Sequence, residues 1–290
     1  MRHLVKAAVL VALVAATLAG PAPGAAASSQ LGMGTTWYSG TVCAGCSVTK
    51  HWNDAVPGLI YTVGYSPAGA TSVEKCVFET VRTWYQQLPS GEREFWFTLK
   101  NASQIACGTN IMLSWLASGA AWSSGGLSPG ESATWVWNNT PFYYSFVAGL
   151  EPSGATSATA CQFEVTRNWY VRQPWDEREF WFVIKNVGTI TCQANILVGW
   201  NTSWFYTGAT TGMLAPGASV TKGWNHVPPA IIYVPNALPF NLTAPAPCQF
   251  EITRTWYTQQ PNGEREYHYI YKNVGTITCE ASILLAESTA

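Results

Sequence analysis

The stretch Cys161-Gln-Phe-Glu-Val-Thr-Arg-Asn-Trp-Tyr170 occurs again as Cys248-Gln-Phe-Glu-Ile-Thr-Arg-Thr-Trp-Tyr257. An earlier version is Cys76-Val-Phe-Glu-Thr-Val-Arg-Thr-Trp-Tyr85. Between residues 161–197 and 248–284, 24 of 37 positions are identical. Self-similarity at a long fixed period is the signature of a repeat architecture. We conclude that one module occurs three times in this chain.

Each repeat has the features of β structure. The segments Phe95-Trp-Phe-Thr-Leu99 and Ile231-Ile-Tyr-Val234 are short, aromatic or β-branched, and bounded by turn residues. Pro-Gly pairs at 129–130 and 216–217 predict tight turns that open the next strand. No segment after the N-terminal leader shows a sustained 3.6-residue apolar period. Five to six strands in about 85 residues is typical of a small β-sandwich.

The aromatic strand, the Lys-Asn-x-Gly turn at 185–188 and the Pro-Gly-x-Ser strand start at 216–219 resemble bacterial immunoglobulin-like adhesion modules. The resemblance assigns no function. We predict an all-β fold of three tandem immunoglobulin-like β-sandwich modules, at 31–118, 119–205 and 206–290. A second framing has two whole modules and complementary halves at 31–75 and 248–290. Within one chain such halves close a ring, and between chains they make a head-to-tail polymer.

The eight cysteines fit one disulfide in each repeat. Three pairs have the same spacing of 31 residues: Cys76–Cys107, Cys161–Cys192 and Cys248–Cys279. Closing a loop of that size stabilises the fold by roughly 3–4 kcal/mol in the chain-entropy model. The fourth pair, Cys43 and Cys46, encloses Ala-Gly where the other repeats have Pro-Gly. We therefore expect these two cysteines to form a disulfide across a β-turn, in preference to a redox or zinc site.

The N-terminus has the features of a secretory leader. Arg2 and Lys6 precede an apolar run of 13 residues, Ala7 to Ala19, and small residues follow up to Ala27. This run is shorter than the ~20 residues that cross a bilayer. We predict a signal peptide at 1–27 and a secreted, extracellular protein without membrane insertion, in a compartment where disulfides persist.

Composition and charge exclude several classes of function. The net charge of −1 gives no basic surface for nucleic acid. The Glu-Arg-Glu triplets at 92–94, 177–179 and 264–266 could suggest paired glycosidase carboxylates. Because they occur three times, we interpret them as a network that ties strands together. His51, His226 and His268 occupy three different positions of the repeat. We predict no enzyme activity, no catalytic residue, no metal and no cofactor.

Tryptophans that occur in one repeat only are the candidate ligand-binding residues. Trp84, Trp169 and Trp256 recur in every repeat and are expected to pack between strands. The second repeat alone carries three further tryptophans: Trp135, Trp175 and Trp204. Trp135 stands where the other repeats have lysine, and Trp175 stands where they have Ser90 and Asn262, so we expect both to be exposed. An exposed aromatic ring can stack on a sugar or anchor a protein partner. The alternative is a tryptophan that covers a seam with a neighbouring module.

These observations favour a secreted, non-enzymatic binding or adhesion protein. We expect a polysaccharide of an envelope or matrix as the ligand, or a cell-surface or extracellular protein as the partner. Two alternatives stay open. One is a structural subunit that assembles through its modules, and the other is a secreted inhibitor or toxin component that targets a protein.

Overall fold

A computed structural model of the chain describes residues 32–240 and 246–289, and the predicted signal peptide at 1–27 lies outside the described residues. Within them the fold is all-β, as predicted, and contains no helix, so no helix there could span a lipid bilayer. The first strands are β1 (Gly32–Tyr38), β2 (Ser47–Trp52), β3 (Leu59–Ala68), β4 (Cys76–Gln87), β5 (Arg93–Asn101) and β6 (Gly108–Ala117). The next are β7 (Ala120–Ser123), β8 (Ser132–Trp137), β9 (Tyr144–Ser153), β10 (Cys161–Arg172), β11 (Arg178–Asn186) and β12 (Gln193–Thr210). The last are β13 (Ser219–Trp224), β14 (Ile231–Phe240), β15 (Cys248–Gln259), β16 (Arg265–Asn273) and β17 (Glu280–Thr289).

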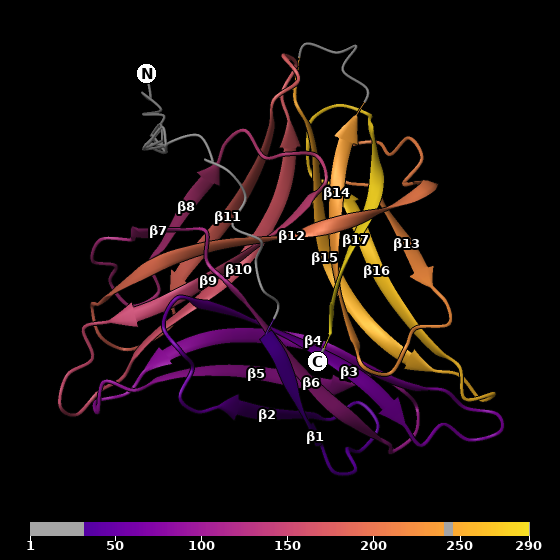
Figure 1. The fold of residues 1–290 in the computed structure, drawn as a ribbon, viewed down its shortest axis with the longest axis horizontal. Coiled ribbons are helices and arrows are strands. Elements are labelled where there is room, and N and C mark those ends of the chain that lie inside the picture. Colours follow the sequence, from indigo (N-terminus) through magenta and orange to yellow (C-terminus); the bar gives the residue numbers. More distant parts are fainter. Residues whose placement is uncertain (1–31, 241–245, 290) are drawn as a thin grey trace, which may run out of the picture.

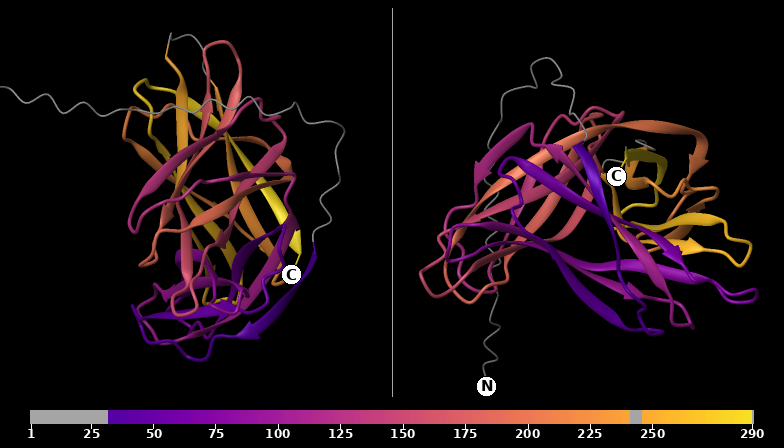
Figure 2. Two further views of the ribbon diagram at one scale, coloured as in Figure 1. Left: turned by 90° about the vertical axis from the view of Figure 1, so that its left-hand side faces the viewer. Right: turned by 60° about the horizontal axis from the view of Figure 1, so that its bottom comes forward.

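Each repeat contributes strands to two facing layers. In the first repeat the strand orders are β2-β5-β4 and β1-β6-β3, all antiparallel. The second repeat has β8-β11-β10 and β7-β12-β9. The third has β13-β16-β15, and its other layer contains β14, β17 and the second half of β12. The long strand β12 therefore links two repeats, as its course across the molecule in Figure 2 shows.

The three long central strands join the repeats in a closed ring. The start of β10 pairs with the end of β4, the start of β15 with the end of β10, and the start of β4 with the end of β15. In Figure 1 these strands form the sides of a triangle, so that the repeats surround an approximate threefold axis. Because strands of all three repeats belong to one nine-stranded sheet, the prediction of tandem immunoglobulin-like modules is not confirmed. The boundaries at 31–118, 119–205 and 206–290 stay a prediction.

One buried arginine crosses each seam of the ring. It is the central residue of each Glu-Arg-Glu triplet: Arg93, Arg178 and Arg265. Arg93 Nη2 donates to the Leu150 carbonyl oxygen of the second repeat at 2.7 Å. Arg178 Nη2 donates to the Ala237 carbonyl oxygen of the third at 3.0 Å, and Arg265 Nε to the Tyr65 carbonyl oxygen of the first at 3.0 Å. Every repeat thus donates arginine hydrogen bonds to one neighbouring repeat and accepts them, at a backbone carbonyl oxygen, from the other.

Each of these guanidinium groups also lies over a buried tyrosine of its own repeat. The distance from guanidinium carbon to ring centre is 4.5 Å for Arg93 on Tyr85 and 4.3 Å for Arg178 on Tyr170. Burial lowers the pKa of Arg178 to about 10, so the group still carries its charge at neutral pH. Burial raises the pKa of Tyr170 to about 12, which keeps that ring neutral. The buried charge is stabilised by carbonyl dipoles and an aromatic face, with no carboxylate required.

At two seams a glycine lies against an isoleucine side chain of the neighbouring repeat, and at the third seam an asparagine stands in place of the glycine. A Cβ atom on Gly64 would lie 2.8 Å from Ile232 Cγ1, and one on Gly149 would lie 2.8 Å from Ile60 Cγ1. The third repeat has Asn236 at this position, where its Oδ1 accepts from Arg178 and its Nδ2 donates to the Tyr144 carbonyl oxygen at 2.6 Å. Asn236 therefore adds hydrogen bonds to the seam between the second and third repeats, at a position where the other two repeats have glycine.

All eight cysteines lie in the described part of the chain, and they form four disulfides. The pairs are Cys43–Cys46, Cys76–Cys107, Cys161–Cys192 and Cys248–Cys279. The last three have the same sequence separation of 31 residues, and each joins two facing layers of one repeat. Four disulfides suit an oxidising, extracellular type of environment.

The buried arginines predict a large difference between two substitutions in the same repeat. We expect Arg178→Ala to lower the free energy of unfolding by about 3–5 kcal/mol, because buried carbonyl groups lose their donor and a void remains. Arg167→Ala removes an exposed ion pair with Glu251 (2.9 Å) and should cost less than about 1 kcal/mol. Urea unfolding of both variants checks this. Equal losses in the two variants would contradict the role given to the buried arginine.

Candidate functional site

Two neighbouring turns form a tip in each repeat, with the same backbone in all three. One is the hairpin turn that follows the central strand, at 88–92, 173–177 and 260–264. The other follows β2, β8 or β13, where Asp54, Asn139 and His226 have left-handed φ values of 53°, 54° and 56°. The next residue in each loop donates its N–H to the carbonyl oxygen of the buried arginine. The three tips lie at different corners of the molecule in Figure 1.

The tip of the second repeat carries three exposed aromatic residues, which we call the aromatic tip: Phe142, Tyr143 and Trp175. Their exposed fractions are 36%, 49% and 68%. Arg172 connects the two turns, because its guanidinium carbon lies 5.0 Å from the Phe142 ring centre and its Nε donates to Asp176 Oδ1 at 2.7 Å. Trp175 Nε1 donates to Glu177 Oε2 at 3.0 Å. The indole is thus oriented by its own turn while its faces stay open to solvent.

The other two repeats have no aromatic residue at these positions. Phe142 corresponds to Pro57 and Pro229, Tyr143 to Gly58 and Ala230, and Trp175 to Ser90 and Asn262. The backbone of the tip therefore forms without any of the three rings. Aromatic residues that the fold does not need, and that are exposed together, point to binding.

The charges around the aromatic tip are nearly balanced. Arg172 forms an ion pair with Asp176, which leaves the Glu177 carboxylate as the additional charge beside the Trp175 ring. A carboxylate can accept several hydrogen bonds, so Glu177 can receive a hydroxyl donor in addition to the indole N–H. Flat apolar faces beside a hydrogen-bond acceptor suit a ring that carries hydroxyl groups. A negatively charged ligand would be repelled.

The structure gives different outcomes for the predicted tryptophans. Trp175 is exposed, as expected. The expectation that Trp135 is exposed is wrong: it is half-buried against the core, and its Nε1 is buried with no hydrogen-bond partner among the described residues. The corresponding Lys50 and Lys222 are half-buried too, since an aliphatic lysine stem can lie along an apolar surface while its ammonium group reaches water. Whether Trp135 takes part in binding stays a prediction.

Trp204 lies in β12, where its backbone pairs with Leu285, but its side chain lies outside the described residues. Phe142 and Tyr143 were not among the residues predicted to bind, since the prediction rested on a comparison of tryptophans alone. The same comparison at 57–58, 142–143 and 229–230 would have identified both.

The tryptophans that recur in all repeats belong to the scaffold. Trp84 lies half-buried on the outer face of the central sheet, with its ring centre 4.9 Å from the Arg82 guanidinium carbon and 5.5 Å from the Trp96 ring centre. Arg82 forms an ion pair with Glu164 of the next repeat, at 2.7 Å. The same arrangement occurs at Trp169, and at Trp256 with His268 in place of the second tryptophan. These residues pack between strands, as predicted.

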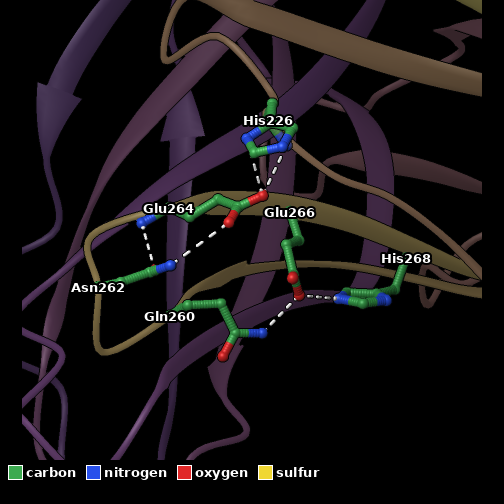
Figure 3. Close-up of polar contacts among 6 residues, drawn as sticks. All are labelled: His226, Gln260, Asn262, Glu264, Glu266 and His268. Carbon is green, nitrogen blue, oxygen red and sulfur yellow. Dashed lines mark hydrogen bonds and ion pairs between the residues drawn. The ribbon is translucent and has the colours of Figure 1, made fainter.

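The tip of the third repeat carries a histidine and a glutamate that contact each other (Figure 3). His226 Nδ1 lies 3.0 Å from Glu264 Oε1, and Asn262 donates its side-chain amide to the same carboxylate at 3.4 Å. Nearby, His268 Nε2 lies 2.9 Å from Glu266 Oε2. Among the described residues, no group of three or more histidine, cysteine or acidic side chains could hold a metal ion. At the first tip, a hydrogen bond to Asp54 raises the pKa of Glu92.

No protein family, curated protein or solved structure matches this chain. The function must therefore be argued from the residues. Three tips with one backbone carry a carboxyl pair, an aromatic cluster and a histidine–glutamate pair. Of the three, the aromatic tip is the one that exposes phenylalanine, tyrosine and tryptophan rings to solvent.

The histidine of the third repeat predicts a pH dependence of stability. Desolvation lowers the pKa of His268, although its bond with Glu266 opposes this. The unfolded chain therefore binds more protons than the folded protein below about pH 6.5, and the free energy of unfolding falls as the pH drops through that range. We expect His268→Trp, which copies Trp96 and Trp181 of the other repeats, to reduce this fall. The check is urea unfolding at pH 7.5 and pH 5.5.

The matched control is His226→Asn, which copies Asn139 and changes a side chain that is 84% exposed. This variant should keep the pH dependence of the wild type. An unchanged pH dependence in His268→Trp would contradict the assignment.

Proposed function

We propose that this protein is a secreted, non-enzymatic carbohydrate-binding protein whose aromatic tip holds a polysaccharide of an envelope or matrix. The observation that carries the proposal is the exposure of Phe142, Tyr143 and Trp175 at one tip, where the other repeats have none of these rings. The apolar face of a sugar stacks on such rings, and the gain comes from burying flat apolar surface on both partners.

The charges at the aromatic tip favour a neutral or amino sugar. The Arg172 charge is neutralised by Asp176, and Glu177 adds one negative charge next to the indole. Carboxylates of an acidic polysaccharide would meet this charge and be repelled. Hydroxyl or ammonium groups would instead donate to Glu177.

Two further features support an extracellular binding role. Four disulfides stabilise a protein outside the cell, and the leader at 1–27 would direct secretion. We also propose that the segments 31–118, 119–205 and 206–290 each derive from one immunoglobulin-like β-sandwich. Two layers of strands per repeat support this division.

Co-sedimentation with insoluble polysaccharides tests the proposal. The oxidised protein should bind a neutral or amino polymer, such as cellulose or chitin, and should bind an insoluble acidic polymer more weakly. We expect Trp175→Ala to weaken binding at least tenfold, or ~1.4 kcal/mol, because the most exposed ring of the tip is lost. Tyr143→Gly, which copies Gly58, should weaken binding as well.

Asn262→Ala is the matched control, since it truncates the corresponding residue in the third repeat and should bind like the wild type. Circular dichroism verifies that every variant is folded. Wild-type affinity in Trp175→Ala, or no binding to any polymer, would contradict the proposal. In the latter case light scattering would test self-assembly, and an extracellular protein partner would be the next candidate.

A further inference from the structure

The central sheet has an opening on the threefold axis. Strands β4, β10 and β15 pair with one another only through their end residues. In the middle of each strand, the pairing with its hairpin partner is interrupted by a bulge, at Val81, Thr166 and Thr253. A bulge bends its strand and ends regular pairing. The three bent strands therefore surround the axis without closing it.

A cavity of about 370 Å³ lies at this opening. Its lining includes residues from the central strands and from the middle of β3, β9 and β14, which face them. Val81, which is 55% exposed, and Arg82 also line the cavity, so it reaches the surface on the outer side of the sheet. The volume lies within the range of small-molecule sites, about 300–1,000 Å³. The aromatic tip contributes none of the lining residues.

The floor of the cavity is apolar. Strands β3, β9 and β14 share one burial pattern, in which two successive residues at the middle of each strand are half-exposed between buried neighbours. Val63, Ala148 and Pro235 are among these residues, and all three line the cavity. Apolar residues in the middle of a strand are normally buried against another layer. Here they remain accessible because the opening lies above them.

The rim is polar and its charges are balanced. Around the axis, three arginine–glutamate pairs join the repeats: Arg82–Glu164, Arg167–Glu251 and Arg254–Glu79. Since each arginine is neutralised by a carboxylate, the rim has no unpaired charge for an ionic ligand. The lining also includes polar side chains of the central strands, among them Thr166, Asn168 and Thr253. Such hydroxyl and amide groups can bond with one polar group of a ligand.

We infer that this axial cavity is a second binding site, which takes an uncharged amphipathic small molecule with an apolar body and one hydrogen-bonding group. The apolar body lies on Val63, Ala148 and Pro235, and the polar group bonds with hydroxyl or amide side chains of the central strands at the mouth of the cavity. The balanced rim disfavours a charged ligand, since such a ligand would lose its hydration without gaining a counter-charge. The site is formed by all three repeats together, and it is independent of the aromatic tip.

Fluorescence titration with N-phenyl-1-naphthylamine tests the inference, because this probe is uncharged, has an apolar body and carries one N–H group. The full, oxidised protein should bind it with saturable, one-site enhancement of fluorescence. Ala148→Trp, which fills the cavity floor, should abolish the enhancement. Ala230→Trp adds the same side chain at the exposed tip of the third repeat and should bind like the wild type. A sulfonated analogue of the probe should bind at least tenfold more weakly than the neutral one.

Val63→Phe fills the cavity from a different strand, so it replaces Ala148→Trp if that variant fails to fold. No saturable binding by the wild type would overturn the inference. So would wild-type affinity in a folded variant with the cavity filled, or equal affinity for the charged analogue.

Discussion

A buried arginine that donates to backbone carbonyl groups of the next repeat is the interaction on which the rest of the structure depends. Arg93, Arg178 and Arg265 occupy one position of the repeat, and each reaches across a different seam. A guanidinium group suits this position because its several N–H donors can serve carbonyl groups of two repeats at once. Because every repeat donates at one seam and accepts at the other, the interactions form a closed cycle. Opening one seam leaves both a donor and its acceptors without partners.

The ring explains why the three tips can differ so much in chemistry. The same arginine whose side chain crosses the seam accepts, through its own carbonyl oxygen, the N–H of the loop at the tip. This backbone hydrogen bond fixes the loop at each tip, so the exposed residues of the tip can differ between repeats. One tip has the carboxyl pair Asp54 and Glu92, and another has His226 with Glu264. The aromatic tip is the third version, with three exposed rings on the same backbone.

Much of the fold could be predicted from the sequence, because equivalent positions of the three repeats can be compared. The conserved spacing of cysteines predicted which of them pair, and alternating aromatic residues predicted strands. A ring within one chain was considered in the second framing, through complementary halves at 31–75 and 248–290. The main-chain pairing among β4, β10 and β15 that closes the ring could not be predicted, because it has no side-chain signature. The Glu-Arg-Glu triplets were interpreted as a network that ties strands together. Their arginines do connect strands of neighbouring repeats, but they donate to backbone carbonyl groups.

The candidate site was predicted in part. Trp175 could be recognised as exposed because the corresponding residues are a serine and an asparagine in a turn. Trp135 was misjudged, since a lysine at the corresponding position indicates that an ammonium group can reach water and does not indicate that the whole side chain is exposed. The axial cavity could not be predicted from the sequence. Its floor consists of ordinary strand residues, such as Val63 and Ala148, which come together only when the three repeats form the ring.

Differential scanning calorimetry of the oxidised protein tests the central claim most directly. If the arginine cycle makes the three repeats one cooperative unit, heating gives a single transition whose van't Hoff enthalpy equals the calorimetric enthalpy. If the repeats are independent modules, the trace resolves into several transitions, or the van't Hoff enthalpy is about one third of the calorimetric value. That second result would contradict the closed ring as the basis of this structure.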